Sequence, residues 1–191
     1  HQSARKDLQK WKEKLKENFY DLDSSFHHSL KMAIPKKFEE LHPSLSSYGK
    51  LVFEKLEKLV NENDLFLNNP RLESYNEIGQ SDQRVIHHPL YHQTGDLIYK
   101  SGMMKKMSSP GGLLPSLAYF YLSSHAEEAG HHCPIACSAG IIRVLQKVPD
   151  FPKKQFFLEK LTESSFETNF TGAQFLTEIQ GGSDVGKNAT F

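Results

Sequence analysis

Two groups of histidines in this chain are candidates for a metal site. One lies around Pro89 and the other near Gly130, and together with their neighbours they comprise His87, His88 and His92, and His125, Glu128, His131, His132 and Cys133. A protein metal site needs three or four imidazole, thiolate or carboxylate ligands that converge from fixed elements. The spacing matches no zinc signature, and the H-E-x-x-H order is absent. We therefore interpret them as helix-end histidines that bind carbonyls or face solvent. A structural metal at His125, Glu128, His131 and Cys133 is the alternative.

Nucleophilic catalysis has little support in the sequence. No G-x-S-x-G segment is present to carry a serine nucleophile. Cys137 has histidines nearby, but no oxyanion hole or orienting partner can be named for it. Cys133 and Cys137 are four residues apart, so a bridge between them would close a very small loop and stabilise little. We expect two reduced thiols in a reducing compartment.

A glycine-rich run near the C-terminal end almost forms a phosphate-binding loop. Residues 181–187 contain G-x4-G-K, but Asn188 stands where the loop needs a serine or threonine for magnesium. No amphipathic helix follows that could direct its N-terminal end at a phosphate. The run therefore needs an explanation other than nucleotide hydrolysis.

The elements that would position these residues are mostly helices. Apolar residues recur at steps of three and four, as in Leu8, Trp11, Leu15 and Phe19 of the first segment. The same pattern, with prolines at helix starts, predicts further helices over about 24–33, 35–41, 43–60, 89–104, 114–129, 134–148 and 153–161. The stretch 64–88 lacks this period and contains Pro70 and Gly79, so we expect a long loop there.

The character of the chain changes near Glu167. Residues 173–177, Ala-Gln-Phe-Leu-Thr, are typical of a strand, and residues 181–184, Gly-Gly-Ser-Asp, of a turn. We therefore predict a mainly α fold: an N-terminal helical, up-and-down bundle-like domain over 1–168, followed over 169–191 by the first strand of a β domain that the chain truncates.

Composition excludes several classes of protein. The 191 residues are 38% hydrophobic and 11% aromatic, which argues against a disordered or fibrous chain. The 23 basic and 23 acidic residues balance, so no overall basic field favours nucleic acid. No segment approaches the roughly 20 apolar residues of a membrane span. The first residues contain no apolar signal core, so we expect a cytoplasmic protein without a membrane partner.

Three segments together resemble one protein family. Residues 177–184 read T-E-I-Q-G-G-S-D and resemble the T-E-x-x-x-G-S-D signature of the acyl-CoA dehydrogenase superfamily, at the passage from its N-terminal helical domain to its middle β domain. Residues 125–135 resemble the H-A-x-x-E-A-G-x-x-C-P-I region of its AidB-like branch, with one residue fewer. Residues 88–92 resemble the H-P-x-W-H region of that branch, with Tyr91 in place of the tryptophan. Ile179, where commoner dehydrogenases have proline, also favours this branch.

The resemblance implies that FAD is the cofactor and that the C-terminal segment binds it. Main-chain groups of Gln174, Phe175 and Leu176 would lie along the flavin ring, and the Thr177 hydroxyl would bond its polar edge. Gly181 and Gly182 would allow close backbone approach. Ser183 would donate to the cofactor or to the thioester arm, and Asp184 would fix the loop by accepting backbone N–H bonds.

The implied reaction is α,β-dehydrogenation of an acyl-CoA thioester, with an electron acceptor protein as the second partner. In this family the carboxylate base lies in a C-terminal helical domain, so we expect it beyond Phe191 and name no catalytic residue in this chain. The whole protein would be a homotetramer, and any DNA contact would come from its C-terminal region. The fragment alone would have little or no activity. The alternative is a non-enzymatic helical interaction module.

Overall fold

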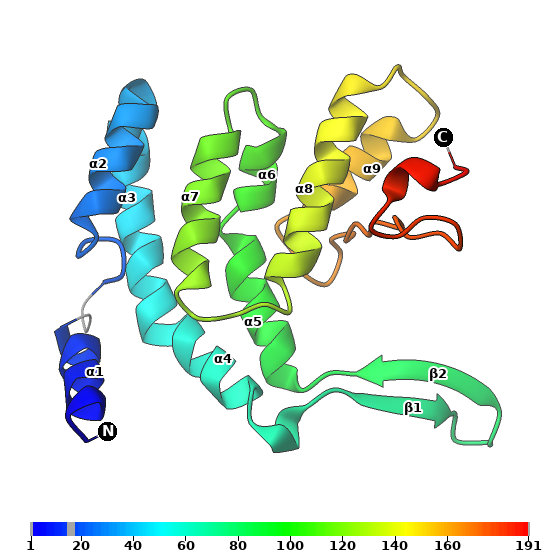
Figure 1. The fold of residues 1–191 in the computed structure, drawn as a ribbon, viewed down its shortest axis with the longest axis horizontal. Coiled ribbons are helices and arrows are strands. Elements are labelled where there is room, and N and C mark those ends of the chain that lie inside the picture. The colour runs from blue at the N-terminus through cyan, green and yellow to red at the C-terminus, as the bar shows by residue number, and fades with distance from the viewer. Residues whose placement is uncertain (1, 15–17, 191) are drawn as a thin grey trace.

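The computed structural model of the chain describes residues 2–14 and 18–190, and it is mainly helical, as predicted. Its helices are arranged as a row of upright elements (Figure 1). Their bounds are α1 Gln2–Lys14, α2 Ser24–Ala33, α3 Pro35–Leu51, α4 Glu57–Asn63, α5 Pro89–Lys100, α6 Met103–Ser108, α7 Leu113–Ser124, α8 His132–Lys147 and α9 Lys154–Leu161. Short 3₁₀ turns lie at Phe66–Asn68 and Val185–Lys187. Of the apolar residues that predicted the first helix, Leu15 lies outside the described residues.

The helix α3 runs through Pro43, where we had predicted a break. It continues into a π-helical turn, Val52–Leu56, and then directly into α4. Its buried positions explain the wide turn: Tyr48, Val52, Leu56 and Val60 recur every four residues. An α-helix has 3.6 residues per turn, so a strict four-residue spacing would drift off one face. The wider π turn lets all four side chains remain in the core.

The core lies between α3, α5, α6, α7 and α8. Its most buried large side chains include Tyr20, Leu45, Ile98, Met103, Leu122 and Ile142. Side-chain hydrogen bonds join the layers: the Ser116 hydroxyl of α7 donates to the Met103 carbonyl of α6 at 2.8 Å, and the Tyr119 hydroxyl donates to Ser44 of α3 at 2.8 Å. Among the described residues no helix is both long enough and apolar enough to cross a bilayer.

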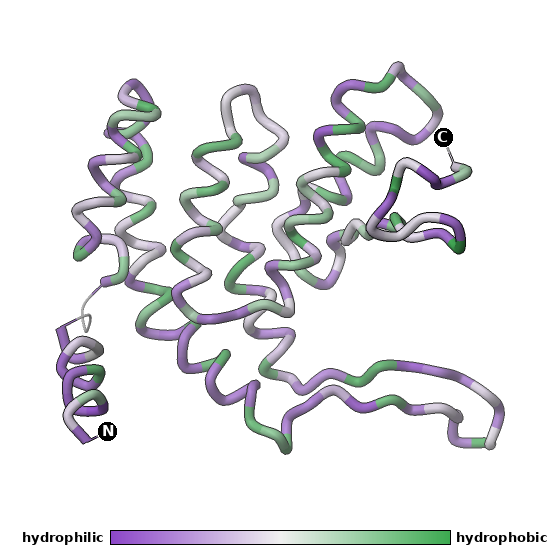
Figure 2. The backbone as a smooth tube through the Cα atoms, in the orientation of Figure 1, coloured by the Kyte–Doolittle hydropathy of each residue, from purple (hydrophilic) through white to green (hydrophobic). Residues whose placement is uncertain are grey.

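A β-hairpin occupies the stretch that we had predicted to be a loop. Strands β1, Arg71–Tyr75, and β2, Ser81–Ile86, pair antiparallel with Leu72 opposite Val85 and project away from the helices (Figure 1). The Asn76 side chain accepts bonds from the N–H groups of Ile78 and Gln80, and Gly79 has a positive φ of 77°. The prediction failed because both strands are largely exposed and mix polar with apolar residues (Figure 2), so no alternating pattern marks them.

The predicted strand at 173–177 is also wrong for this structure. Residues 171–177 have no strand assignment, and the nearest pairing is an isolated bridge between Glu178 and Gly181. Phe175 and Leu176 are exposed, at 98% and 62%. A strand needs a neighbouring strand to satisfy its N–H and C=O groups, and within the described residues none lies beside this segment. The sequence pattern is that of a strand, but no described segment pairs with it.

Candidate functional site

The C-terminal segment that carries the glycine-rich motif is anchored to α8 at Gly172. The backbone N–H of Gly172 donates to the hydroxyl of Ser138, which is 1% exposed, at 2.8 Å. A β-carbon on Gly172 would collide with the Ile141 side chain and lie 3.1 Å from the Ser138 Cα. Glycine is therefore required for the chain to approach α8 this closely. The anchor fixes where residues 173–190 leave the helical layer.

Residues 173–177 beyond this anchor present a free backbone edge. All five are exposed, and Gln174 extends its side-chain amide toward Gly140 of α8. Within the described part of the chain, the N–H groups of Gln174, Phe175, Leu176 and Thr177 make no hydrogen bond. The only bond to this stretch reaches its carbonyl side, where the Asn188 side chain donates to the Leu176 oxygen. The segment is thus held from one side while its donors remain available.

The glycine-rich loop after this edge is closed by Glu178. Its carboxylate accepts bonds from the N–H groups of Ala189, at 2.8 Å, and Thr190, at 3.1 Å. A hydrogen bond from the Thr190 side chain, together with these N–H bonds, holds the pKa of this exposed carboxyl below its usual range. A β-carbon on Gly181 would meet the Asn188 side chain and lie 2.8 Å from the Asp184 carbonyl oxygen. The loop is therefore built around an obligatory glycine at 181.

Asp184 does not have the role that we predicted for it. Its carboxylate lies 3.0 Å from the Lys187 ammonium in an exposed ion pair, and it accepts no backbone N–H bond within the described chain. Glu178 performs the loop-fixing role instead, because its carboxylate accepts the N–H groups of Ala189 and Thr190 at the end of the loop. Ser183 and Thr177 are exposed, and a β-carbon on Gly182 would meet only the Thr177 methyl group at 3.6 Å. Gly181 is therefore sterically required by the loop itself, and Gly182 is not.

The buried side chain of His131 links the start of α8 to α5. His131 is 1% exposed, and its Nε2 lies 2.9 Å from the Tyr91 carbonyl oxygen, which fixes the tautomer with hydrogen on Nε2. Its ring stacks on Tyr91 at 4.1 Å and meets Phe166 edge-on at 4.8 Å. A β-carbon on Gly95 would collide with the rings of His131 and Phe166, so this glycine makes room for their contact. Burial lowers the pKa of His131 to about 4.

Glu128 caps α8 from the preceding loop. Its two carboxylate oxygens accept the His131 N–H, each at 2.9 Å, and one also accepts the His132 N–H at 3.3 Å. These are donors that the start of a helix leaves unsatisfied, and a negative charge is favoured there. Burial nevertheless raises the pKa of Glu128 above its usual range, against the lowering effect of these bonds. The H-A-E-E-A-G-H-H-C-P-I segment is therefore a helix-capping unit.

These residues do not form the alternative metal site. His131 binds a carbonyl, Glu128 binds backbone N–H groups, His125 stacks on Phe19 at 4.9 Å, and Cys133 is exposed. Across residues 2–14 and 18–190, no group of three or more potential ligand side chains lies close enough to hold a metal ion. His131 and Glu128 are thus engaged by backbone groups, as in the helix-end interpretation, whereas His125 lies against an aromatic ring.

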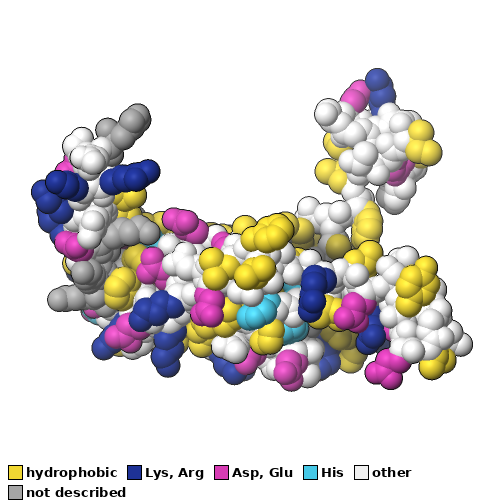
Figure 3. All heavy atoms as spheres, turned by 90° about the horizontal axis from the view of Figure 1, so that it is seen from below, with side chains coloured by type: hydrophobic (Ala, Val, Ile, Leu, Met, Phe, Trp, Pro, Cys, Tyr) yellow, Lys and Arg dark blue, Asp and Glu magenta, His cyan; other side chains and the backbone are white. Residues whose placement is uncertain are grey.

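The group around Pro89 also has structural contacts. The Nδ1 of His88 accepts the Leu90 N–H at 3.3 Å and caps α5. His87 stacks on the other face of Tyr91 at 4.0 Å, so Tyr91 is enclosed between His87 and His131. Some histidine side chains reach the surface on the face seen from below, with acidic and apolar side chains around them (Figure 3). Cys133 and Cys137 are both free.

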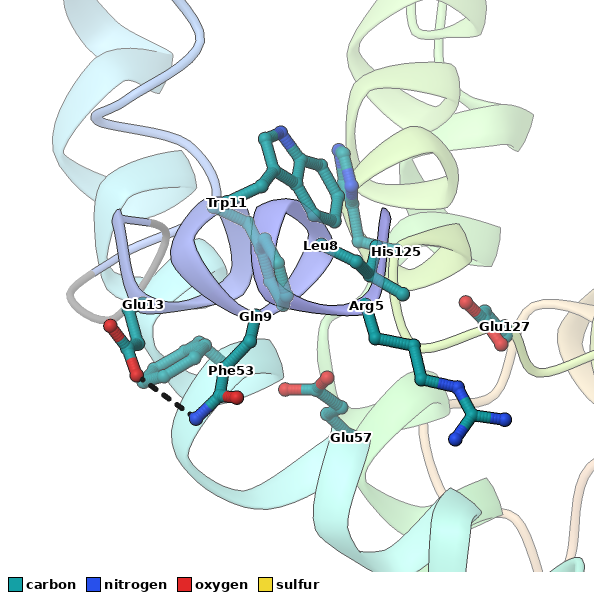
Figure 4. Close-up of a pocket in the computed structure, with 10 residues that line it drawn as sticks. Arg5, Leu8, Gln9, Trp11, Glu13, Phe53, Glu57, His125 and Glu127 are labelled. Carbon is teal, nitrogen blue, oxygen red and sulfur yellow. Dashed lines mark hydrogen bonds between the residues drawn. The ribbon is translucent and has the colours of Figure 1, made fainter. Parts of the chain in front are cut away.

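A groove separates α1 from the helical row. It has a volume of about 530 Å³ and is lined on one side by Leu8 and Trp11 of α1 and on the other by Phe53, Glu57 and His125 (Figure 4). Trp11 and Leu8 are each 55% exposed, so α1 covers this groove only partly. The groove lies at the opposite end of the row from the glycine-rich segment (Figure 1), so it does not contribute to that site.

The sequence missed the residues that position the glycine-rich segment. Ser138, Gly172 and Gly95 belong to no motif that we recognised, and only their small size in a helical or loop context could have indicated close packing. Glu178 was noted as part of the signature, but its role in closing the loop required the distance between residues 178 and 189.

Comparison with known proteins identifies one family. The family model described as the adaptive response protein AidB N-terminal domain matches residues 10–168. A comparison with curated proteins gave no match. Two solved structures share the fold. Caenorhabditis elegans ACDH-11 in complex with C11-CoA has 21% identity and a TM-score of 0.76, and the match covers 88% of this chain and 30% of that chain. The apo-form of Bd2924 has 19% identity and a TM-score of 0.77, and the match covers 88% of this chain and 34% of that chain. This chain thus spans about a third of the length of each.

Proposed function

Because the chain belongs to the AidB N-terminal domain family, we propose that it supplies the helical part and the flavin-facing segment of an FAD-dependent acyl-CoA dehydrogenase-like oxidoreductase. The family membership confirms the resemblance inferred from the three sequence segments. The observation that carries the proposal is the free backbone edge at residues 174–177, which is anchored on α8 and followed by a loop built around Gly181. Such an edge offers N–H donors that water alone satisfies until a cofactor covers them.

The proposed division of the chain is a helical domain over 1–168 and the beginning of a β domain over 169–191. The anchor at Gly172 lies shortly after this boundary. On either side of this anchor, Phe170, Phe175, Leu176, Ile179 and Val185 are all substantially exposed. Exposed apolar side chains grouped in one segment mark a surface that is covered by another element or a ligand. A β domain and a flavin would together cover this one.

The residues that would hold FAD have the chemistry that a flavin ring requires. Main-chain N–H groups and small hydroxyls can bond the polar edge of the ring, and Gly182 has no close neighbour that would prevent a ligand from approaching its backbone. The proposed contacts are the main-chain groups of Gln174, Phe175 and Leu176, the hydroxyls of Thr177 and Ser183, and the backbone of Gly182. When bound, the flavin would supply hydride acceptance.

The proposed reaction is α,β-dehydrogenation of an acyl-CoA thioester. Glu178 is not proposed as the base that removes the α-proton, because its carboxylate is committed to the N–H groups of Ala189 and Thr190. What this chain contributes is orientation of the cofactor and donors near its polar edge, which favour an anionic reduced ring. The base is proposed to lie in sequence beyond Phe191.

The proposed substrate class is supported by one structural relative. The ACDH-11 structure contains C11-CoA, an acyl-CoA, although the two chains share only 21% identity. We propose an acyl-CoA or a related thioester as substrate, an electron acceptor protein as second partner, a homotetramer as the assembly and the cytoplasm as the location.

The test is flavin binding by the longest natural protein that contains this sequence, purified without denaturant. The expected result is the visible absorbance of bound FAD, bleached by a suitable acyl-CoA under anaerobic conditions. Absence of flavin absorbance together with failure to bind added FAD would overturn the proposal and favour a non-enzymatic helical interaction module. The 191-residue chain alone is expected to show little or no turnover with acyl-CoA and an artificial electron acceptor.

A further inference from the structure

A second cavity lies far from the glycine-rich loop in sequence and has a different chemical character. It has a volume of about 330 Å³ and lies between the end of α4, the start of α5 and the loop between α7 and α8. Three acidic side chains line it, Asp64, Glu127 and Glu128, and no lysine or arginine does. We call this cavity the acidic cleft.

The negative charge of the acidic cleft is not neutralised by the protein. None of the ion pairs formed by the described residues involves Asp64, Glu127 or Glu128. Glu128 uses its oxygens on backbone N–H groups, and Asp64 lies near enough to raise its pKa by repulsion. Like charges gathered in one partly enclosed space favour a cationic ligand.

A buried hydroxyl in the cleft has no partner. Thr94 of α5 lines the cleft, is 1% exposed, and its Oγ1 makes no hydrogen bond. In a helix, a threonine hydroxyl commonly bonds the carbonyl three or four residues earlier, which satisfies it locally. Thr94 forgoes that bond. A buried hydroxyl without a partner is destabilising, so its persistence calls for a ligand atom as the missing partner.

A second unpartnered atom lines the cleft at the end of α4. The side-chain oxygen of Asn63 is buried and accepts no hydrogen bond in the described chain. An amide oxygen can only accept, and a threonine hydroxyl can accept as well as donate. Two vacant acceptors beside three carboxylates require a ligand with several N–H or O–H donors.

The aromatic side chain of the cleft limits the kind of cation. Tyr91 lines the cleft, but His87 covers one face of its ring at 4.0 Å and His131 the other at 4.1 Å. Quaternary ammonium ions are recognised on exposed aromatic faces, and neither face of Tyr91 is open. Recognition here must therefore rest on hydrogen bonds, which a primary ammonium can make and a quaternary one cannot.

We propose that the acidic cleft binds a small organic cation with a primary ammonium group, held by Thr94, Asn63 and the carboxylate of Asp64. A divalent metal ion is a poorer fit, because no three potential ligands in the described chain lie close enough to hold one. The proposal does not depend on flavin binding or on dehydrogenase activity, so its success or failure is independent of theirs.

The test is calorimetric titration of the 191-residue chain with 1,4-diaminobutane, choline and magnesium chloride in parallel. Diaminobutane is expected to bind at least about tenfold more tightly than choline, since one or two charge-assisted hydrogen bonds distinguish them. Equal binding of diaminobutane and choline, no binding of diaminobutane, or tighter binding of magnesium than of diaminobutane would each overturn the proposal.

Three variants assign the binding to the cleft. Thr94→Val and Asp64→Asn are each expected to weaken diaminobutane binding about tenfold. Asp96→Asn, on the exposed side of α5 where Asp96 pairs with Lys100, is the control and is expected to leave it unchanged. Thr94→Val should also leave the unliganded chain at least as stable, because it removes an unpartnered hydroxyl without changing shape. Full binding by both Thr94→Val and Asp64→Asn would refute the assignment.

Discussion

The hydroxyl of Ser138 accepts the backbone N–H of Gly172 at 2.8 Å and joins α8 to the glycine-rich segment across 34 positions of sequence. Both sides of this contact are sterically constrained, because Ser138 is buried and Gly172 has no room for a β-carbon. The contact sets the direction in which the proposed flavin-facing edge leaves the helices. The proposed site is thus tied to α8 by this hydrogen bond and by the close approach that Gly172 allows.

Replacing Ser138 by alanine should loosen this connection. The Gly172 N–H would lose its partner in a partly buried position, which costs about 1–3 kcal/mol. We expect a lower free energy of unfolding in urea and faster hydrogen exchange at the Gly172 amide. Ser29→Ala, an exposed serine in α2, is the control and should change neither. An unchanged exchange rate at Gly172 in Ser138→Ala would contradict the anchoring role.

Most of the helices could be predicted because apolar periodicity records which face is buried. The apolar face predicted for the segment 43–60 comprises Leu45, Tyr48, Val52, Leu56, Leu59 and Val60, and the structure buries all of them except Leu59, which is half-buried. The break predicted at Pro43 was wrong because the chain accommodates the missing N–H within one longer helix. Sequence patterns predict well which residues are helical, but they predict poorly whether two neighbouring helical segments form one helix or two.

The hairpin and the glycine-rich segment could not be predicted in the same way. The hairpin pairs strands that bury almost nothing, so Leu72 and Val85 give no alternating signal. The segment at 173–177 has the composition of a strand, but strand formation depends on a partner that the described chain does not provide. For the site, the motif indicated the residues, while the anchor at Ser138 and the closure by Glu178 depend on contacts remote in sequence.

The two adjacent glycines of the loop should respond differently to alanine. A β-carbon at Gly181 would lie 2.8 Å from the Asp184 carbonyl, so Gly181→Ala should disrupt the loop in the chain itself. A β-carbon at Gly182 would meet only Thr177, at 3.6 Å, so Gly182→Ala should leave the loop intact. Amide chemical shifts of residues 177–190 would check both expectations.

The same pair then tests the proposed cofactor contact. If a flavin approaches the backbone of Gly182, Gly182→Ala should weaken FAD binding by the longest natural protein about tenfold or more, although its loop is undisturbed. Retention of full FAD affinity by Gly182→Ala would argue that Gly182 does not face the cofactor.

The carboxyl of Glu128 should make stability fall as pH rises. Burial raises its pKa in the folded chain above the ordinary value of 4.5, so the folded state holds its proton more tightly than the unfolded state. The stabilisation is complete below pH 4.5 and is lost as pH rises through the folded pKa. Glu128→Gln should remove this part of the pH dependence in urea unfolding, and the exposed neighbour Glu127→Gln should not. Identical pH profiles for the wild type and Glu128→Gln would contradict this assignment.

His131 should act in the opposite direction, because burial lowers the pKa of a base. Its folded pKa is about 4 against an ordinary 6.5, so the unfolded chain takes up the proton first as pH falls. The stabilisation is present above pH 6.5 and is lost between about 6.5 and 4, by at most about 3.5 kcal/mol at about 1.4 kcal/mol per pKa unit.

Two measurements check the prediction for His131. A titration of the histidine ring protons by NMR should give one ring, assignable to His131, that stays neutral to near pH 4. Urea unfolding of His131→Phe, which keeps an aromatic ring against Tyr91, should show a smaller loss of stability between pH 6.5 and 4 than the wild type. His28→Gln, at an exposed position in α2, should retain the wild-type loss. A His131 ring that titrates near 6.5 would mean that the site is open to water and that the Tyr91–His131 stack does not exclude it.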